Sequence, residues 1–183
     1  QGWQKIKENG MDVLEAVLTG GTTEKQPFGP TGFVSLYTIS YRMCSNAGSM
    51  DHSEALYERA NRAIGRYLED HVKPALGELQ GEYVLRAFAR AWENHKLMVK
   101  WVQQLFRHLD NGYIANSSVA TLTSCGLRQF FDIAFHRAKR AVRAALIAAV
   151  NRERDGEAVD RALLTSVIDI FPVMGLCSKS TDL

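Results

Sequence analysis

Phe33 to Cys44 read FVSLYTISYRMC, a short stretch that carries more apolar surface than one helix face requires. At about 100° per residue around a helix axis, its apolar side chains gather on two arcs. The first arc holds Phe33, Val34, Tyr37, Tyr41 and Cys44, and the second holds Leu36, Ile39 and Met43. A surface helix usually needs a single apolar stripe of about this width. The pattern predicts either a helix buried on both sides, or a helix with one stripe in the core and an aromatic stripe free to bind a partner.

The totals around this stretch are those of an ordinary globular protein. The chain has 183 residues, 46% of them hydrophobic, and a net charge of +2, which indicates neither a nucleic-acid nor a membrane partner. Cys44, Cys125 and Cys177 are far apart and form no CxxC pair. Such cysteines are typical of free thiols in a reducing compartment, so we expect a cytoplasmic and nuclear location. No apolar run approaches the length of a membrane span.

Apolar residues recur at three- and four-residue steps along most of the chain, which is typical of helices. Glycine, proline and polar clusters interrupt this pattern at 20–32, 46–50, 77–81 and 155–156, and we expect Pro74 and Pro172 to bend or end the helices that contain them. The predicted helical segments are 3–18, 33–44, a long one from about 53, 82–92, 95–114, 126–134, 136–150 and 158–171. Segments 82–92 and 95–114 are either two helices or one with a break. The sequence predicts an all-α fold of stacked antiparallel helices.

Residue patterns that support catalysis or metal binding are missing. The five histidines are never spaced as zinc ligands are, and none has a cysteine at such a distance. The sequence contains no GxSxG motif and no phosphate-binding glycine-rich loop. We therefore expect no enzyme, no metal and no cofactor.

One local concentration of positive charge lies between residues 136 and 143. It consists of Arg137, Lys139, Arg140 and Arg143. A basic helix can bind nucleic acid or an acidic membrane, but few aromatic residues alternate with these side chains, and Val142, Leu146 and Val150 form an ordinary core stripe. A solvated helix face and a basic binding surface both fit this pattern.

Three blocks of sequence, in this order, resemble the N-terminal region of plant-type cullins. They are LYTISYRMC with SEALYERANRAIGRYLEDHVKPAL (36–44 and 53–76), WENHKLMVKWVQQLFRHLD (92–110) and NRERDGEAVDRALLTSVIDIF (151–171). The resemblance implies helical repeats of about five helices each, with residues 1–118 as a first, adaptor-binding repeat and 119–183 as the start of a second.

In cullins, the second and fifth helices of the first repeat bind an adaptor of the BTB/POZ fold, which in SCF ligases is a Skp-type protein carrying an F-box receptor. Carried over by position, the contacts of the second helix are Phe33, Val34, Tyr37 and Tyr41, and those of the fifth helix are His108 and Asn111. Leu36, Ile39 and Met43 would then face inward. The chain departs from the family at Leu109-Asp110-Asn111, where cullins usually have an arginine in the last position.

The resemblance implies a scaffold of an SCF-type ubiquitin ligase, with the Skp-type adaptor as its partner and no nucleic acid or membrane. Because the sequence ends soon after Pro172, we expect the RING-binding part to be missing and no RING protein to bind this chain. Two alternatives stay open. The chain could be a truncated decoy that competes for adaptors, or it could bind nucleic acid or acidic membranes through its basic helix.

Overall fold

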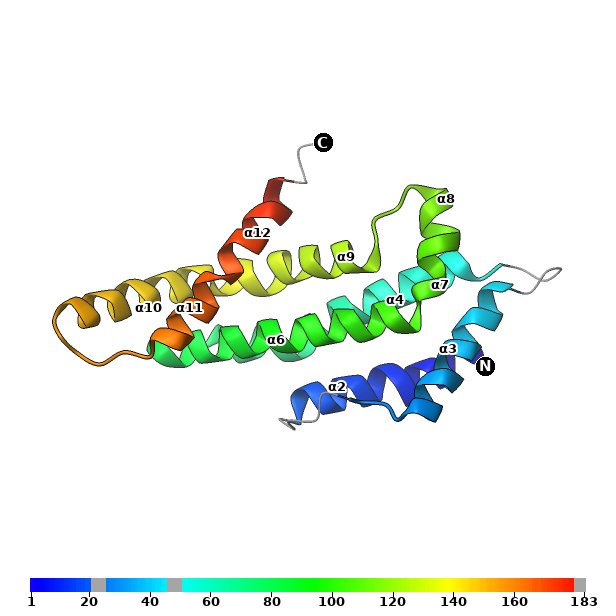
Figure 1. The fold of residues 1–183 in the computed structure, drawn as a ribbon, viewed down its shortest axis with the longest axis horizontal. Coiled ribbons are helices and arrows are strands. Elements are labelled where there is room, and N and C mark those ends of the chain that lie inside the picture. Colours follow the sequence, from blue (N-terminus) through cyan, green and yellow to red (C-terminus); the bar gives the residue numbers. More distant parts are fainter. Residues whose placement is uncertain (21–25, 46–50, 180–183) are drawn as a thin grey trace. The chain divides into compact units, whose positions relative to one another are not determined.

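A computed structural model describes residues 1–20, 26–45 and 51–179, with side chains through residue 175. Every regular element in these ranges is helical and none is a strand (Figure 1), so the all-α prediction is confirmed. The predicted connection 46–50 lies outside the described residues, as does part of the predicted loop 20–32.

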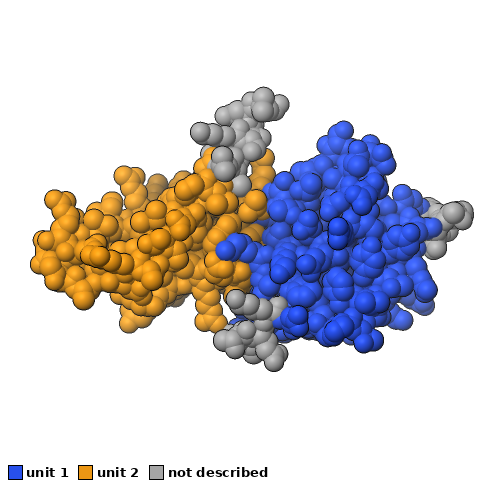
Figure 2. Space-filling view, viewed as in Figure 1, with its two compact units in different colours: residues 1–64, 96–126 blue, residues 65–95, 127–183 orange. Residues whose placement is uncertain are grey.

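The helices form two compact units (Figure 2). The first unit comprises residues 1–64 and 96–126, and the second comprises 65–95 and 127–183. The predicted boundary at 118/119 refers to family repeats rather than to these units, and it stays a prediction.

The first unit begins with the predicted helix 3–18, which forms as one helical run. Its parts are α1 (Gly2–Ile6), the π-helical turn η1 (Lys7–Met11) and α2 (Asp12–Thr19). The double-striped stretch then lies in α3 (Pro30–Ser45), and α1 packs against it (Figure 1). Helix α3 begins three residues earlier than predicted because Pro30 suits a first helical position, where a backbone N–H is not needed.

The long predicted helix forms and continues past Pro74. It consists of α4 (Ser53–Tyr67), the π-helical turn η2 (Leu68–Val72) and α5 (Lys73–Gly77). Proline cannot donate to the carbonyl four residues back, and its ring crowds that turn. The widened turn just before Pro74 accommodates both effects, so the helical path ends only at Gly77.

Residues 81–117 are helical with one break, which lies later than the sequence pattern suggests. Helix α6 (Gly81–Leu105) runs without interruption through Trp92 and His95, and the break falls at Phe106, whose φ is −111° and ψ is 19°. The chain continues as α7 (Arg107–Leu109), the π-helical turn η3 (Asp110–Ile114) and α8 (Ala115–Ser117). Asn111-Gly112, a pair that disfavours a regular helix interior, lies in η3.

The remaining segments are also helical. One run consists of α9 (Leu122–Gln129), η4 (Phe130–Phe135) and α10 (His136–Arg154). After the predicted turn at Asp155-Gly156 come α11 (Arg161–Ile168) and α12 (Ile170–Lys179). The predicted interruption falls at Asp169 rather than at Pro172, since Pro172 lies in the first turn of α12, where its missing N–H is tolerated.

The core of the second unit is aromatic and lies between α6 and η4. Phe88 and Phe130 are fully buried with ring centroids 5.8 Å apart, and Trp92 contacts Phe130 at 5.0 Å. Helix α10 adds small residues and Val142 to this core, but Val150 is 43% exposed. The prediction that Val150 belongs to the core stripe is therefore wrong, because alanines occupy the inward positions of the last turns.

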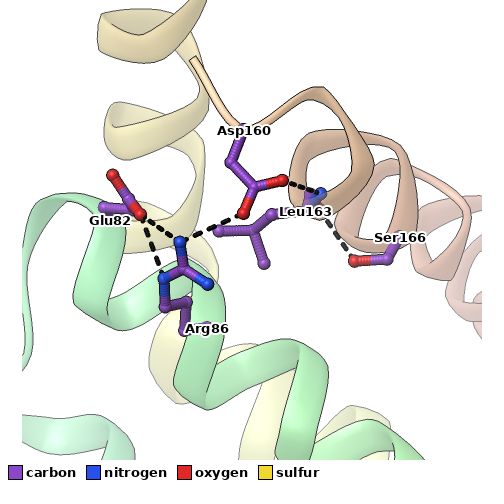
Figure 3. A network of polar contacts seen from close by, with 5 residues as sticks. All are labelled: Glu82, Arg86, Asp160, Leu163 and Ser166. Atoms are coloured by element: carbon purple, nitrogen blue, oxygen red, sulfur yellow. Dashed lines mark hydrogen bonds and ion pairs between the residues drawn. The ribbon is translucent and has the colours of Figure 1, made fainter. Parts of the chain in front are cut away.

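An exposed ion-pair network connects the start of α11 with α6 (Figure 3). Arg86 donates from Nη2 to Asp160 Oδ2 at 3.0 Å and also pairs with Glu82 on its own helix. The other oxygen of Asp160 accepts from the Leu163 backbone N–H at 3.0 Å and thereby caps α11. In the third block of sequence that resembles cullins, Asp160 therefore caps α11 and connects it with α6.

Candidate functional site

Helix α3 has one buried face and one exposed face. Leu36 and Ser40 are buried, whereas Val34 is 59% exposed and Tyr41 is 49% exposed. Phe33 and Tyr37 are half-buried. The alternative that this helix is buried on both sides is therefore wrong.

The inward face of α3 rests on the N-terminal helical run. Leu36 lies over Gly10, where an added Cβ would come within 3.5 Å of its Cδ1 atom. At Gly2 an added Cβ would lie only 2.7 Å from Met43 Sδ and 3.6 Å from Ile39 Cγ2. The inward orientation predicted for Leu36, Ile39 and Met43 is confirmed, although Ile39 and Met43 are only half-buried.

The outward face of α3 carries a continuous row of aromatic contacts. Phe33 and Tyr37 stack at 6.5 Å between ring centroids, and Tyr37 and Tyr41 stack at 6.3 Å. Trp101 of α6 meets Phe33 edge-on at 5.9 Å. Together with His108, these four residues are called the aromatic ridge below. Aromatic pairs at such distances restrain each other's orientation, so the ridge is ordered before any partner arrives.

His108 of α7 lies against the two tyrosines of the ridge. Its ring is edge-on to Tyr37 and to Tyr41, with both centroid distances at 5.9 Å. Both ring nitrogens are shielded from solvent, and within the described ranges 1–20, 26–45 and 51–179 neither has a hydrogen-bond partner. Burial lowers the pKa of His108 from its ordinary value of 6.5. The imidazole is therefore neutral at physiological pH.

A buried hydroxyl fixes α3 to the end of α6. Ser40 is fully buried, and its Oγ atom lies 2.8 Å from the carbonyl oxygen of Leu105, the last residue of α6. The same Oγ atom lies 2.8 Å from the Tyr37 carbonyl oxygen of its own helix, so the hydroxyl proton is shared between the two acceptors. The break at Phe106 directs the following amides elsewhere, since Leu109 N–H donates to Phe106 and Asp110 N–H donates to Arg107. Ser40 thus satisfies a carbonyl that the helix end leaves without its usual partner, and it sets the ridge beside His108.

The structure brings four of the six predicted contact residues together: Phe33, Tyr37, Tyr41 and His108. Val34 is exposed on the same helix, one turn before Thr38, and makes none of the ring contacts. Asn111 is exposed on η3, at the position where the family resemblance implied an arginine. The role of all six residues in binding stays a prediction.

Two residues of this region were not identified from the sequence. Trp101 has the spacing of an ordinary core residue in the sequence, yet it forms one end of the ridge. Its spacing of seven residues from His108 would place both on one side of an unbroken helix. Ser40 lies between the two apolar arcs of the helix, and its sequence position does not indicate a structural role, because its partner is 65 residues away in the chain.

A cleft of about 400 Å³ opens next to His108. It lies between the end of α3 and the η3–α8 segment, with Asp51 and Ser53 at its edge. Asp51 accepts hydrogen bonds from the backbone N–H and the hydroxyl of Ser53, which lower the pKa of its carboxyl. Its charge is thus engaged within the chain.

The basic residues of α10 differ in their surroundings. The Arg137 guanidinium extends over Gly77, 3.7 Å from the place a Cβ would occupy, and Lys139 lies 3.5 Å from His136. Arg140 and Arg143 are exposed.

Within the part of the chain that the structure describes, no group of three or more metal-ligating side chains comes together. Among the same residues, no helix has the length and apolar character needed to cross a bilayer.

The chain matches the model of the cullin alpha solenoid domain over residues 3–182. It is 36% identical to Cullin-1 of Oryza sativa subsp. japonica over 178 residues, which is 97% of this chain and 24% of that protein. It is 34% identical to putative cullin-like protein 2 of Arabidopsis thaliana, over 96% of this chain and 46% of that protein, and 33% identical to Arabidopsis Cullin-2 over 93% and 23%. The chain thus spans about a quarter of the length of the two Cullin relatives. On these grounds it belongs to the cullin family.

Proposed function

We propose that this chain is a non-catalytic scaffold module of a ubiquitin ligase of the SCF type, which binds a Skp-type adaptor of the BTB/POZ fold that carries an F-box protein. Membership of the cullin family supports the scaffold role. The observation that carries the adaptor proposal is the aromatic ridge, because it lies on the outward face of the helix that matches the adaptor-binding helix of cullins. The module works by holding its partner in a fixed position.

The energetics of this surface favour a protein partner. Phe33 and Tyr37 are half-buried, so each is already held by its neighbours but still offers ring surface to a partner. Buried aromatic anchors dominate many interfaces, and truncation of one anchor typically costs about 2 kcal/mol or more. Tyr41 adds apolar area, with a hydroxyl that can remain hydrated at the edge. A rigid surface of this kind loses little entropy on binding.

The fifth-helix contribution is weaker here than in other cullins. Asn111 presents an amide where a guanidinium would offer a forked, charged donor. Adaptor binding by this chain therefore depends mainly on the apolar ridge, and we expect it to vary only weakly with salt.

The test is a calorimetric titration of the chain with a purified Skp-type adaptor bound to an F-box protein. We expect the double variant Phe33→Ala/Tyr37→Ala to lose affinity at least about 30-fold, the equivalent of about 2 kcal/mol. Arg42→Ala is the matched control, because Arg42 is exposed on the same helix but lines the hollow on the side of Gly2 and Trp3. Equal affinity of the double variant and the wild type, at unchanged helical content, would refute the assignment.

The same titration separates an adaptor surface from the basic helix. If Arg140 and Arg143 carried the interaction, the affinity would fall steeply as salt is raised. Binding through the ridge predicts a shallow salt dependence. It also predicts no effect of Arg140→Ala/Arg143→Ala on the adaptor.

A further inference from the structure

We propose that His108 is a positioning residue of the adaptor surface, which holds the Tyr37 and Tyr41 rings in their binding orientation only while its imidazole is neutral. The proposal rests on the function proposed above and adds a regulation to it, namely that acid weakens partner binding through this side chain.

The geometry around His108 explains why the neutral form is required. Its ring supports Tyr37 and Tyr41 at equal centroid distances of 5.9 Å, so a movement of the imidazole removes a neighbour from both rings. Neither ring nitrogen has a hydrogen-bond partner among the residues that the structure describes, and both are shielded from water. A neutral imidazole leaves one N–H unpaired, whereas an imidazolium would leave two N–H groups and a full charge without partners. Burial of such a charge is strongly unfavourable.

No charged group in the described part of the chain compensates that charge. From the cleft side, the Asp51 carboxylate is hydrogen-bonded by Ser53 and forms no ion pair with His108, whose pKa responds to burial alone. The thiol of Cys44 has a pKa raised by burial and stays neutral. The other titratable groups that face or flank His108 are the phenols of Tyr37, Tyr41 and Tyr113, and Arg107 and Asp110 beside it in the chain; none is ion-paired with it. Residues 46–50, Asn-Ala-Gly-Ser-Met, carry no ionisable side chain.

The cleft beside His108 is large enough to accept the imidazole ring when it is protonated. It offers about 400 Å³ next to the imidazole and is lined by polar groups of Asn116, Ser117 and Asp51. Protonation therefore drives the ring out of its aromatic contacts toward water, and the two tyrosines lose their common support. If the partner binds only the neutral form, the affinity falls by up to about tenfold for each pH unit below the pKa of His108.

The experiment compares the wild type with His108→Phe and with His136→Gln. Phenylalanine keeps an aromatic ring at the site and cannot be protonated, while His136 is exposed on α10 in the other unit and serves as the matched histidine control. Affinity for the Skp-type adaptor is measured from about pH 7.5 to about pH 5, the range in which histidines titrate. In parallel, the imidazole and tyrosine ring signals of the free chain are followed by nuclear magnetic resonance.

We expect the wild type and His136→Gln to lose affinity together as the pH falls, and His108→Phe to lose at least threefold less over the same range. In the free chain, the Tyr37 and Tyr41 signals should shift together with the titration of the His108 imidazole. Identical pH profiles of His108→Phe and the wild type, or tyrosine signals that do not follow His108, would overturn the proposal. Absence of adaptor binding at pH 7.5 would instead refute the proposed function, and the resonance measurement would still decide whether His108 controls the tyrosines.

Discussion

Replacement of Ser40 by alanine tests how α3 is attached to the rest of its unit. The hydroxyl is fully buried and lies 2.8 Å from the Leu105 carbonyl, at a helix end where the following amides bond elsewhere. Alanine fits the space and favours helix slightly more than serine does. It nevertheless leaves a buried carbonyl oxygen without a donor, which costs about 1–3 kcal/mol. The helix preference of alanine offsets a few tenths of a kcal/mol, so we expect a net loss of about 1–2.5 kcal/mol.

The measurement is urea unfolding of Ser40→Ala followed by far-ultraviolet circular dichroism, with Ser35→Ala as the matched control. Ser35 is exposed on the same helix, so its replacement changes helix preference without removing a buried partner. We expect Ser35→Ala to unfold at the same urea concentration as the wild type or a higher one. If Ser40→Ala is as stable as Ser35→Ala, the hydroxyl does not satisfy the end of α6, and the account of how α3 is positioned is refuted.

Three further predictions concern packing, capping and pH. Gly126→Ala should lower the free energy of unfolding by about 1–3 kcal/mol, because the new Cβ would lie 2.5 Å from Val99 Cγ2, while Gly112→Ala, with open space around it, should not. Asp160→Ala should lower the free energy of unfolding by about 1 kcal/mol, because it removes the cap of α11. Asp160→Asn keeps the capping oxygen and should lower it only slightly, since the exposed pair with Arg86 contributes little. Equal losses of stability for the two variants in thermal unfolding would contradict this prediction. The unfolded chain binds a proton at His108 more readily than the folded chain does, because burial lowers the pKa of His108 in the folded state. The free energy of unfolding should therefore decrease as the pH drops below about 6.5, and it should stop decreasing below the pKa of the folded state. The His108→Phe variant should lack this component in urea unfolding at each pH.

The sequence was sufficient to predict the helical fold and the two apolar stripes of α3, because both follow from the local spacing of apolar residues. Phe33, Tyr37 and Tyr41 recur at four-residue steps, so any helix places them on one side. The spacing alone did not decide whether both stripes are buried; the inward direction of Leu36 was implied by the family resemblance. These inferences needed no knowledge of the neighbours of α3.

Features that depend on distant partners could not be predicted in this way. The break at Phe106 frees the Leu105 carbonyl, and the buried Ser40 hydroxyl contacts that carbonyl. The local sequence around neither residue indicates this contact. Continuation of the helix through Pro74 required a π-helical turn, which has no reliable sequence signal. Val150 appeared to be a core residue because its spacing from Val142 is helical, but the small residues Ala145 and Ala149 face the core instead.

The environment of His108 also depends on tertiary contacts and could not be predicted from the local sequence. The family resemblance placed this residue at the adaptor surface as a direct contact. In the structure its nitrogens are shielded between the tyrosines and the cleft. Its position in the chain alone could not distinguish a side chain that touches a partner from one that supports the residues that do.

The central claim is that Phe33 and Tyr37 on α3 anchor an adaptor. The most direct measurement is the dissociation constant of a Skp-type adaptor for the wild-type chain and for Phe33→Ala/Tyr37→Ala, with Arg42→Ala as the control and circular dichroism to confirm folding. The account predicts nearly equal constants for the wild type and the control, and one at least about 30-fold larger for the double variant. A double variant that is folded and binds the adaptor as tightly as the wild type would contradict it.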